Sequence, residues 1–489
     1  MRRSAHSSAR HAIRLVALLA AVQLAATPLA AQPATAPPSA AAAAAFESGT
    51  ASYREGAYPE AYRLFRRAAS EPGYSTTTTA ALLMAGKAAY ADADFDGAVS
   101  SLTTLIATYP QSRYTPEARR VLALATAGGP NGQGRPFDLG VVLPVSGANG
   151  YLGQALFNGV RIAVDEHNRA VEAGGAEGAP RRQVRLVFRD SGGNGPAASD
   201  AVGDAVEAGA DAIVGPLFSD EAEPAAARAE AAGVVLVAPL ATDDAVSAGR
   251  RFAFQANPTF AARGRVMARY TVQRLGLRRV GVVTQSGTPG ETDGSAFAAE
   301  ARRLGATVGF DRQLASAEDW PDLDRRVGAS ALAAVQAVYL PVTGADAPEH
   351  IAEAVRALEA VRGAPRPIGN TEWEGITTSR ERASRMNAVF GQDFFVAPGA
   401  SDAFGRRYRE LSGIGPDRLA LIGYDVTRML LANLEPAPGQ AGSEGTLADR
   451  LRAAPTFQGI AHRFGFGGQQ VNESLFILGY RGGDAVLIE

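Results

Sequence analysis

Residues 215–244, GPLFSDEAEPAAARAEAAGVVLVAPLATDD, carry the clearest indication of the fold. The segments DAIVGP (211–216) and GVVLVAP (233–239) are short and continuously apolar, and helix-forming residues lie between them. This order predicts a β-α-β unit with parallel strands, whose carboxyl ends meet at one edge of a sheet. Because ligands of open α/β sheets bind at that edge, Ser219 and Thr242 are candidate contacts for a small solute.

Two interpretations of Ser219 follow from its position before the expected helix. A helix that starts just after Ser219 adds free N–H donors and the positive end of its dipole, which suits a carboxylate. In the alternative, Ser219 and Asp220 only cap that helix. The stretch by itself leaves both interpretations open.

Composition excludes several classes of function. The chain has 489 residues, 46% of them hydrophobic and 20% charged, with a net charge of −2, which is ordinary for a globular protein of more than one domain. The near-zero charge implies no general attraction to nucleic acid. The absence of cysteine excludes disulfides, thiolate metal sites, cysteine nucleophiles and a lipid-modified cysteine. Lys87 is the single lysine, and its surroundings fit neither a phosphate-binding loop nor a serine–lysine active site.

The N-terminal region predicts export. Four arginines in MRRSAHSSARHAIR precede the apolar run LVALLAAVQLAATPLAAQ, a pattern typical of a signal peptide over residues 1–31. Residues 32–45 are rich in Pro and Ala and are expected to be a disordered tether. We expect the mature protein to be periplasmic or secreted and soluble, with no membrane span after signal cleavage, and not to be a lipoprotein.

Residues 46–127 contain an internal repeat with a period of 37 residues. GTASYREGAYPEAYRLF (49–65) matches GKAAYADADFDGAVSSL (86–102), with small and aromatic residues recurring at helical spacing. This pattern resembles tetratricopeptide-type helix pairs and predicts either a stacking spacer or a docking surface for a peptide or protein. GGPNGQGRP (128–136) is a linker.

From residue 137 onward, strand and helix patterns alternate. The expected strands are FDLGVVLPV, RQVRLVFRD, DAIVGP, GVVLVAP, RRVGVVTQ, AVQAVYLPV and QDFFVAP, and the tail from residue 463 is expected to form β-hairpins. Such alternation predicts parallel sheets that are covered by helices on both faces. The length of this region favours two lobes.

No catalytic or cofactor-binding constellation is present. GNGPAA (193–198) imitates a dinucleotide fingerprint, but Asp211 lies at the start of the strand that follows, whereas a ribose contact would need an acidic residue at the end of that strand. After the signal peptide, His167, His350 and His462 are scattered and lack metal-ligand spacing. We therefore expect a protein that is not an enzyme and that holds no metal or cofactor.

Residues 137–489 resemble the Leu/Ile/Val-binding, type 1 periplasmic binding protein family. The resemblance is carried by LPVSGANGYLGQALFNGVRIAVDEHN, RLVFRDSGGNGPAASDAV, the 215–244 stretch and LALIGYDVTRMLLANL. It implies an α/β fold with two lobes, lobe 1 at about 137–257 and 398–459 and lobe 2 at about 258–397 and 460–489. The chain would cross between lobes near Asn257, Pro398 and Gly459.

The same resemblance implies a set of ligand-binding residues. In amino-acid-binding members, a serine after the third strand and a threonine after the fourth hold the ligand's carboxylate and ammonium together with backbone groups. These roles would fall to Ser219, Thr242 and the Leu240 carbonyl. The second lobe would supply an acidic residue for the ligand's ammonium group, and this role would fall to Glu372. The second lobe of such proteins usually adds a tyrosine as well, but the matching loop of this chain, LPVTGADAPE, has none. Two aromatic residues complete the expected set: Trp373, for which a place in the core is the alternative, and, in the first ligand loop, Tyr151.

Two functions follow from these resemblances. The first is a solute-binding protein that closes on an amino-acid-like or anionic ligand and delivers it to an ABC permease. The second arises because a helical repeat fused to such a domain is similar to penicillin-binding protein activators, as are GPLFSD, FAFQANPTF and VYLPV. That likeness implies a scaffold whose partner is a peptidoglycan synthase.

Overall fold

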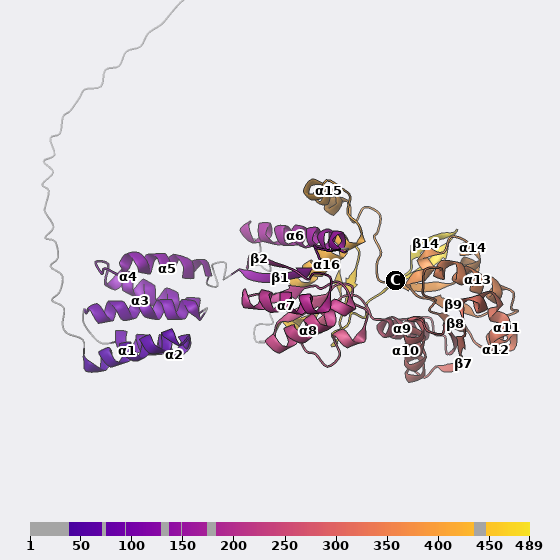
Figure 1. The fold of residues 1–489 in the computed structure, drawn as a ribbon, viewed down its shortest axis with the longest axis horizontal. Coiled ribbons are helices and arrows are strands. Elements are labelled where there is room, and N and C mark those ends of the chain that lie inside the picture. Colours follow the sequence, from indigo (N-terminus) through magenta and orange to yellow (C-terminus); the bar gives the residue numbers. More distant parts are fainter. Residues whose placement is uncertain are drawn as a thin grey trace, which may run out of the picture. The chain divides into compact units, whose positions relative to one another are not determined.

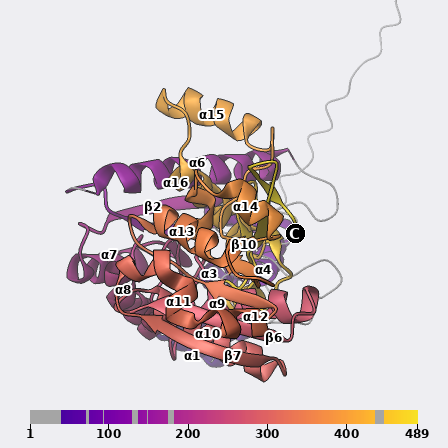
Figure 2. The same ribbon diagram turned by 90° about the vertical axis from the view of Figure 1, so that its right-hand side faces the viewer.

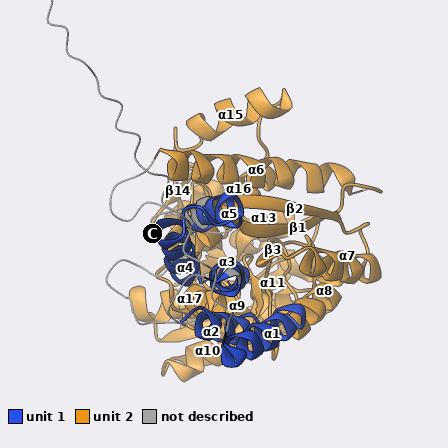
Figure 3. Cartoon of the chain, turned by 90° about the vertical axis from the view of Figure 1, so that its left-hand side faces the viewer, with its two compact units in different colours: residues 1–126 blue, residues 127–489 orange. Residues whose placement is uncertain are grey.

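A computed structural model describes residues 39–70, 75–92, 94–128, 136–147, 149–173, 182–434 and 446–489. The predicted signal peptide, residues 32–38 of the predicted tether and most of the predicted linker lie outside these residues. The chain divides into two compact units, residues 1–126 and 127–489, which Figure 3 shows in separate colours. None of the described helices is both long enough and apolar enough to cross a membrane.

The described part of the first unit is entirely helical. Helix α1 begins at Ala40, where the Ser39 hydroxyl accepts a hydrogen bond from the N–H of Ala42. The prediction of a disordered tether is therefore wrong for residues 40–45, because a run of alanines after a serine cap favours a helix. The helices of this unit are α1 (Ala40–Arg54), α2 (Tyr58–Ala69), α3 (Thr76–Ala91), α4 (Phe95–Thr108) and α5 (Thr115–Gly128).

The sequence repeat corresponds to a repeated structure. A Cβ atom on Gly49 would lie 2.9 Å from the ring of Phe65, and one on Gly86 would lie 2.5 Å from the side chain of Leu102. Both glycines therefore let one helix of a pair approach the next closely. The aromatic residues that follow them also pack in equivalent edge-on pairs: Tyr53 with Tyr58, and Tyr90 with Phe95. The helical repeat is thus real, and its membership of the tetratricopeptide class stays a prediction.

The first sheet of the second unit is parallel, with the strand order β2-β1-β3-β4-β5, and Figure 1 labels β1 and β2 of it. Strand β3 leads into helix α8 (Ser219–Ala232), which leads into β4, so the predicted β-α-β unit is confirmed. The order reverses between β1 and β3, which is where open α/β sheets bind ligands. The strands are β1 (Phe137–Leu143), β2 (Val184–Asp190), β3 (Ala212–Val214), β4 (Val235–Ala238) and β5 (Ala253–Gln255).

The second sheet has the order β14-β13-β10-β9-β8-β6-β7, and Figure 2 labels β10, β6 and β7 of it. The expected C-terminal hairpin is confirmed as the antiparallel pair β13–β14, whereas the strand expected in QDFFVAP is wrong, because β10 ends where that segment begins. The strands are β6 (Arg279–Gln285), β7 (Thr307–Leu314), β8 (Ala337–Leu340), β9 (Arg366–Gly369), β10 (Val389–Gln392), β13 (Phe476–Arg481) and β14 (Asp484–Leu487). A separate short pair joins β11 (Phe457–Gln458) to β12 (Arg463–Phe464).

Helices cover both faces of each sheet, and apolar side chains fill the space between. In the first lobe, α6 (Gly150–Glu172) and α16 (Arg418–Leu431) pack on one face, and α7 (Gly195–Glu207) and α8 pack on the other (Figure 1). In the second lobe, α9 (Phe260–Arg269) and α10 (Gly290–Arg303) cover one face. The opposite face is covered by α11 (Leu323–Val327), α12 (Ala329–Ala334), α13 (Ala347–Glu359) and α14 (Arg380–Arg385). The first lobe also holds α15 (Asp402–Ser412) and α17 (Leu447–Ala453).

The chain crosses between the lobes three times. The first crossover lies at Asn257, between β5 and α9, as expected, and the second begins at Asp393, directly after β10 and before the expected Pro398. The third lies near Asn472 and not near Gly459. The reason is that the buried carboxylate of Asp425 in α16 accepts hydrogen bonds from three backbone N–H groups at residues 460–462, which ties that loop to the first lobe.

A buried carboxyl group lies inside the second lobe. Asp293 of α10 has no exposed surface, and one of its oxygens accepts a hydrogen bond of 2.6 Å from the hydroxyl of Tyr339, while the other has no hydrogen-bond partner among the described residues. Burial raises the pKa of Asp293 from 3.8 to about 7, and the Tyr339 hydrogen bond only partly opposes this shift. The folded protein therefore holds this proton more tightly than the unfolded chain does.

We predict that Asp293 makes the stability of the protein fall as the pH rises. Its contribution is fully present below pH 3.8 and is lost as the pH rises to about 7, at about 1.4 kcal/mol per pH unit. Asp293→Asn should remove this slope and should be more stable than the unchanged protein at pH 8. Urea unfolding of both proteins between pH 5 and pH 8 measures the difference, and parallel profiles would contradict the prediction.

Candidate functional site

Ser219 joins the loops that follow two neighbouring strands. It is the first residue of α8, directly beyond β3, and its hydroxyl oxygen accepts hydrogen bonds from the N–H groups of Thr242 (3.0 Å) and Asp243 (3.1 Å), beyond β4. The residue at the N-cap of α8 is Phe218, and no side chain caps this helix. The alternative that Ser219 only caps its own helix is therefore wrong. No described residue accepts a hydrogen bond from this hydroxyl, so its proton can be donated to a ligand.

A short chain of hydrogen bonds leads from this loop pair to the crossovers. The carbonyl of Leu240 accepts a hydrogen bond of 3.2 Å from the side-chain amide of Asn257, at the first crossover. The amide oxygen of Asn257 in turn lies 3.4 Å from the guanidinium of Arg263 in α9. The Leu240 carbonyl is thus already an acceptor within the protein, and Asn257 connects the first lobe to the second.

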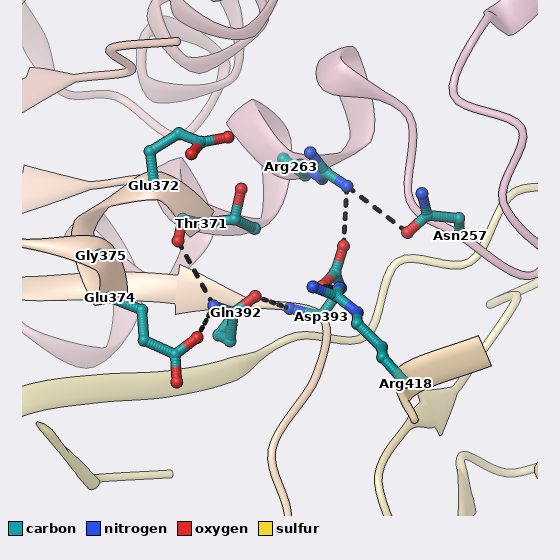
Figure 4. A pocket seen from close by; sticks show the side chains of 9 residues that line it. All are labelled: Asn257, Arg263, Thr371, Glu372, Glu374, Gly375, Gln392, Asp393 and Arg418. Atoms are coloured by element: carbon teal, nitrogen blue, oxygen red, sulfur yellow. Dashed lines mark hydrogen bonds and ion pairs between the residues drawn. The ribbon is translucent and has the colours of Figure 1, made fainter. Parts of the chain in front are cut away.

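A pocket of about 440 Å³ lies at these crossovers (Figure 4). Its walls come from the first crossover, the start of α9, the turn Thr371–Gly375 after β9, the end of β10 and the start of α16. Of the expected ligand-binding residues, Glu372 lies here. The lining residues are Asn257, Arg263, Thr371, Glu372, Glu374, Gly375, Gln392, Asp393 and Arg418.

Asp393 is the centre of an ion-paired cluster in this pocket. Its buried carboxylate lies 2.8 Å from the guanidinium of Arg263 and forms a second ion pair with Arg418, at the start of α16. Burial alone would raise the pKa of Asp393, but the positive charges of the two arginines outweigh burial and lower it. The guanidinium of Arg418 also lies over the ring of Phe394, 4.9 Å from its centre.

Glu372 is the pocket's unpartnered acid. Its carboxylate is half-buried and forms no hydrogen bond or ion pair with any described residue. Burial raises its pKa, and the positive charge of Arg263 partly opposes that shift. In contrast, Glu374 accepts a hydrogen bond of 2.6 Å from the amide of Gln392. A cationic group of a ligand would find its counter-charge at Glu372.

Five of the six expected site residues do not line this pocket: Ser219, Leu240 and Thr242 belong to the strand-end loops of the first lobe, and Trp373 and Tyr151 lie elsewhere. Trp373 is fully buried in the core of the second lobe, and its indole donates a hydrogen bond of 3.1 Å to the carbonyl of Leu340. The expectation that Trp373 lines the ligand site is therefore wrong, because its side chain points into the core although its neighbour Glu372 lines the pocket. Tyr151, near the start of α6, is 72% exposed and is not among the residues that line the pocket.

The expected set lacks the residues that give the pocket its positive charge. Arg263 lies on α9 and is buried there together with the small or apolar residues Ala262, Gly264 and Met267. An arginine among small and apolar residues is a signal that could have been read, because buried charges need partners. Its partner Asp393 lies 130 residues away, and no sequence pattern connects the two. Among the described residues, no group of His, Asp or Glu side chains could hold a metal ion.

Comparisons with known proteins agree with this architecture. A family model described as a periplasmic binding protein matches residues 136–484. No curated protein matches the chain. A solved structure from Rhodospirillum rubrum, assigned as a branched-chain amino acid ABC transporter, is 23% identical with a TM-score of 0.56, covering 72% of this chain and 100% of its own.

Two further solved structures are ABC transporter substrate-binding proteins. The one from Desulfitobacterium hafniense is 21% identical, and the match covers 72% of this chain and 100% of the other. The one from Sphaerobacter thermophilus is 20% identical, with 72% and 96% covered. Both have a TM-score of 0.50, and at these identities the three structures establish the fold alone.

We predict that Asp393 contributes more to stability than Arg418 does. Asp393→Ala should cost about 3–5 kcal/mol, because it leaves the buried guanidinium of Arg263 without a counter-charge. Arg418→Ala should cost less than about 1 kcal/mol, because the Arg418 side chain is half exposed. Urea unfolding of the two variants measures both values, and equal losses would contradict the prediction.

Proposed function

Because this chain belongs to the periplasmic binding protein family, we propose that it is a non-enzymatic solute-binding protein of the periplasm or the extracellular space. Its two lobes close on a small amino-acid-like or anionic ligand by rotation at the crossovers near Asn257, Asp393 and Asn472. The ligand is then passed to an ABC-type permease, as the names of the solved substrate-binding proteins suggest.

One observation carries this proposal: polar groups at the strand ends of the first lobe are connected through Asn257 to a pocket whose wall also holds an unpaired acid of the second lobe. The free hydroxyl proton of Ser219 and the first-turn N–H groups of α8 can hold a carboxylate. Glu372 offers a counter-charge for an ammonium group. Asn257 links the two regions at a crossover, so a ligand that contacts both would favour one relative placement of the lobes.

We predict that Ser219→Ala weakens ligand binding by about 10-fold to 100-fold. The variant removes the hydroxyl that would donate a hydrogen bond to the ligand's carboxylate, a loss of about 1–3 kcal/mol in binding free energy. Isothermal calorimetry against a panel of amino acids and small carboxylic acids measures the affinity. The matched control is Ser401→Ala, because Ser401 precedes α15 and forms no side-chain cap.

Two results would contradict the proposal. If no member of the panel binds the folded protein at millimolar concentration, the chain is not a receptor for such solutes. If Ser219→Ala binds its ligand as tightly as Ser401→Ala does, the strand-end loops do not contact the ligand.

A second candidate function is a scaffold for peptidoglycan synthesis, in which the helical unit binds a cell-wall synthase. The observation that favours it is the independent core of this unit, in which the repeated residues make equivalent contacts. A transport receptor has no evident use for such a unit, since a permease would contact the lobes.

We predict that deleting residues 32–135, with the signal peptide kept, leaves one of the two functions intact and abolishes the other. A receptor should keep its solute affinity, because the pocket lies wholly in the second unit. A scaffold should lose capture of its partner. Calorimetry and crosslinking in envelope extracts, with full-length protein as the control, separate them. The scaffold function is wrong if a synthase is captured equally well without the helices, or is never captured.

A further inference from the structure

We infer that the pocket selects a polar solute, one with a cationic nitrogen and hydrogen-bonding groups in place of a branched aliphatic side chain. This inference rests on the proposed function, because it names the class of ligand for the same site. It departs from the branched-chain amino acids in the name of the Rhodospirillum rubrum protein.

The first step is the chemistry of the pocket walls. Among the described residues that line it, none has an aliphatic or aromatic side chain: the lining is formed by two arginines, three acids, two amides, one threonine and one glycine. A branched side chain gains about 1.5–3 kcal/mol on burial only where apolar atoms surround it. In this pocket it would instead strip water from amides and charges without replacing their hydrogen bonds, which is unfavourable.

The second step concerns which charges remain for a ligand. Both oxygens of Asp393 are taken by arginines, one by Arg263 and the other by Arg418. Glu374 already accepts from Gln392. The half-buried carboxylate of Glu372 has no such partner, so it is the acid that a ligand cation can neutralise.

The third step is the separation of charge across the pocket. In Figure 4, Glu372 and Glu374 lie on one side and Arg263, Asp393 and Arg418 on the other. With one acid and two arginines, the second group carries net positive charge. The side chain of Arg418 is 51% exposed, so its remaining N–H groups can donate to acceptor atoms of a ligand. A ligand with a cation at one end and acceptors at the other fits this arrangement.

The test uses pairs of amino acids that have nearly the same shape and differ in polarity. Calorimetry with the full chain compares L-threonine with L-valine and L-asparagine with L-leucine. We expect the polar member of each pair to bind at least 10-fold more tightly, because sites that hydrogen-bond a ligand discriminate strongly against apolar analogues.

Two variants test the assigned residues. Thr371→Val keeps the shape of the wall and makes it apolar, so it should reduce the preference for threonine over valine. Glu372→Gln should lower the affinity for every amino acid that binds by at least 10-fold, because the ammonium group loses its counter-charge. Glu381→Gln, an exposed acid on α14 outside the pocket, is the charge-matched control and should bind unchanged.

The outcomes separate this inference from the proposed function. Tighter binding of valine or leucine, or of a purely anionic solute without a cationic nitrogen, overturns the inference and leaves the proposed function standing. Equal affinity of Glu372→Gln and Glu381→Gln also overturns it. If no solute in the wider panel binds the folded protein, the proposed function fails and the inference fails with it.

Discussion

The pairing of one buried carboxylate with two arginines holds the candidate site together. Asp393 lies at a crossover, Arg263 belongs to a helix of the second lobe, and Arg418 begins a helix of the first lobe. A buried carboxylate is stable only when its charge is compensated, so α9, which carries the buried Arg263, must stay close to this crossover, while the half-exposed Arg418 adds a weaker ion pair from the first lobe. The cluster therefore holds elements of both lobes at this crossover. Its ion pairs also neutralise the carboxylate of Asp393, which would otherwise be available to a ligand.

The strand-end loops of the first lobe are prearranged in a similar way. Because the Ser219 hydroxyl accepts from two backbone N–H groups beyond β4, the loops after β3 and β4 are held together without a ligand. Preorganised polar groups lose less entropy on binding than mobile ones do. The hydrogen bond from Asn257 to the Leu240 carbonyl connects the loop after β4 to the first crossover, where Asn257 also lines the pocket.

The helical unit is built differently, because it stacks similar helix pairs and does not pack helices on a sheet. Each repeat places a glycine against a large apolar side chain of the next helix, Gly49 against Phe65 and Gly86 against Leu102. Such contacts are local in sequence, and for this reason the period of 37 residues is visible in the amino-acid sequence itself. The same locality allows this unit to have its own apolar core.

Local patterns in the sequence are sufficient to predict the two units and the helical repeat. They also predict the β-α-β unit around Ser219 and the alternation of strands and helices that builds two covered sheets. Each of these features depends on neighbouring residues and their periodicity. The same patterns predict that Ser219 and Thr242 lie close together, because each follows one of two adjacent parallel strands, and the hydrogen bond between them agrees with this. Long-range packing, in contrast, determines that Trp373 is core while Glu372 lines the pocket, and that Arg263 meets Asp393 across 130 residues of chain. Burial and charge pairing depend on which distant segments meet, and no local pattern encodes that.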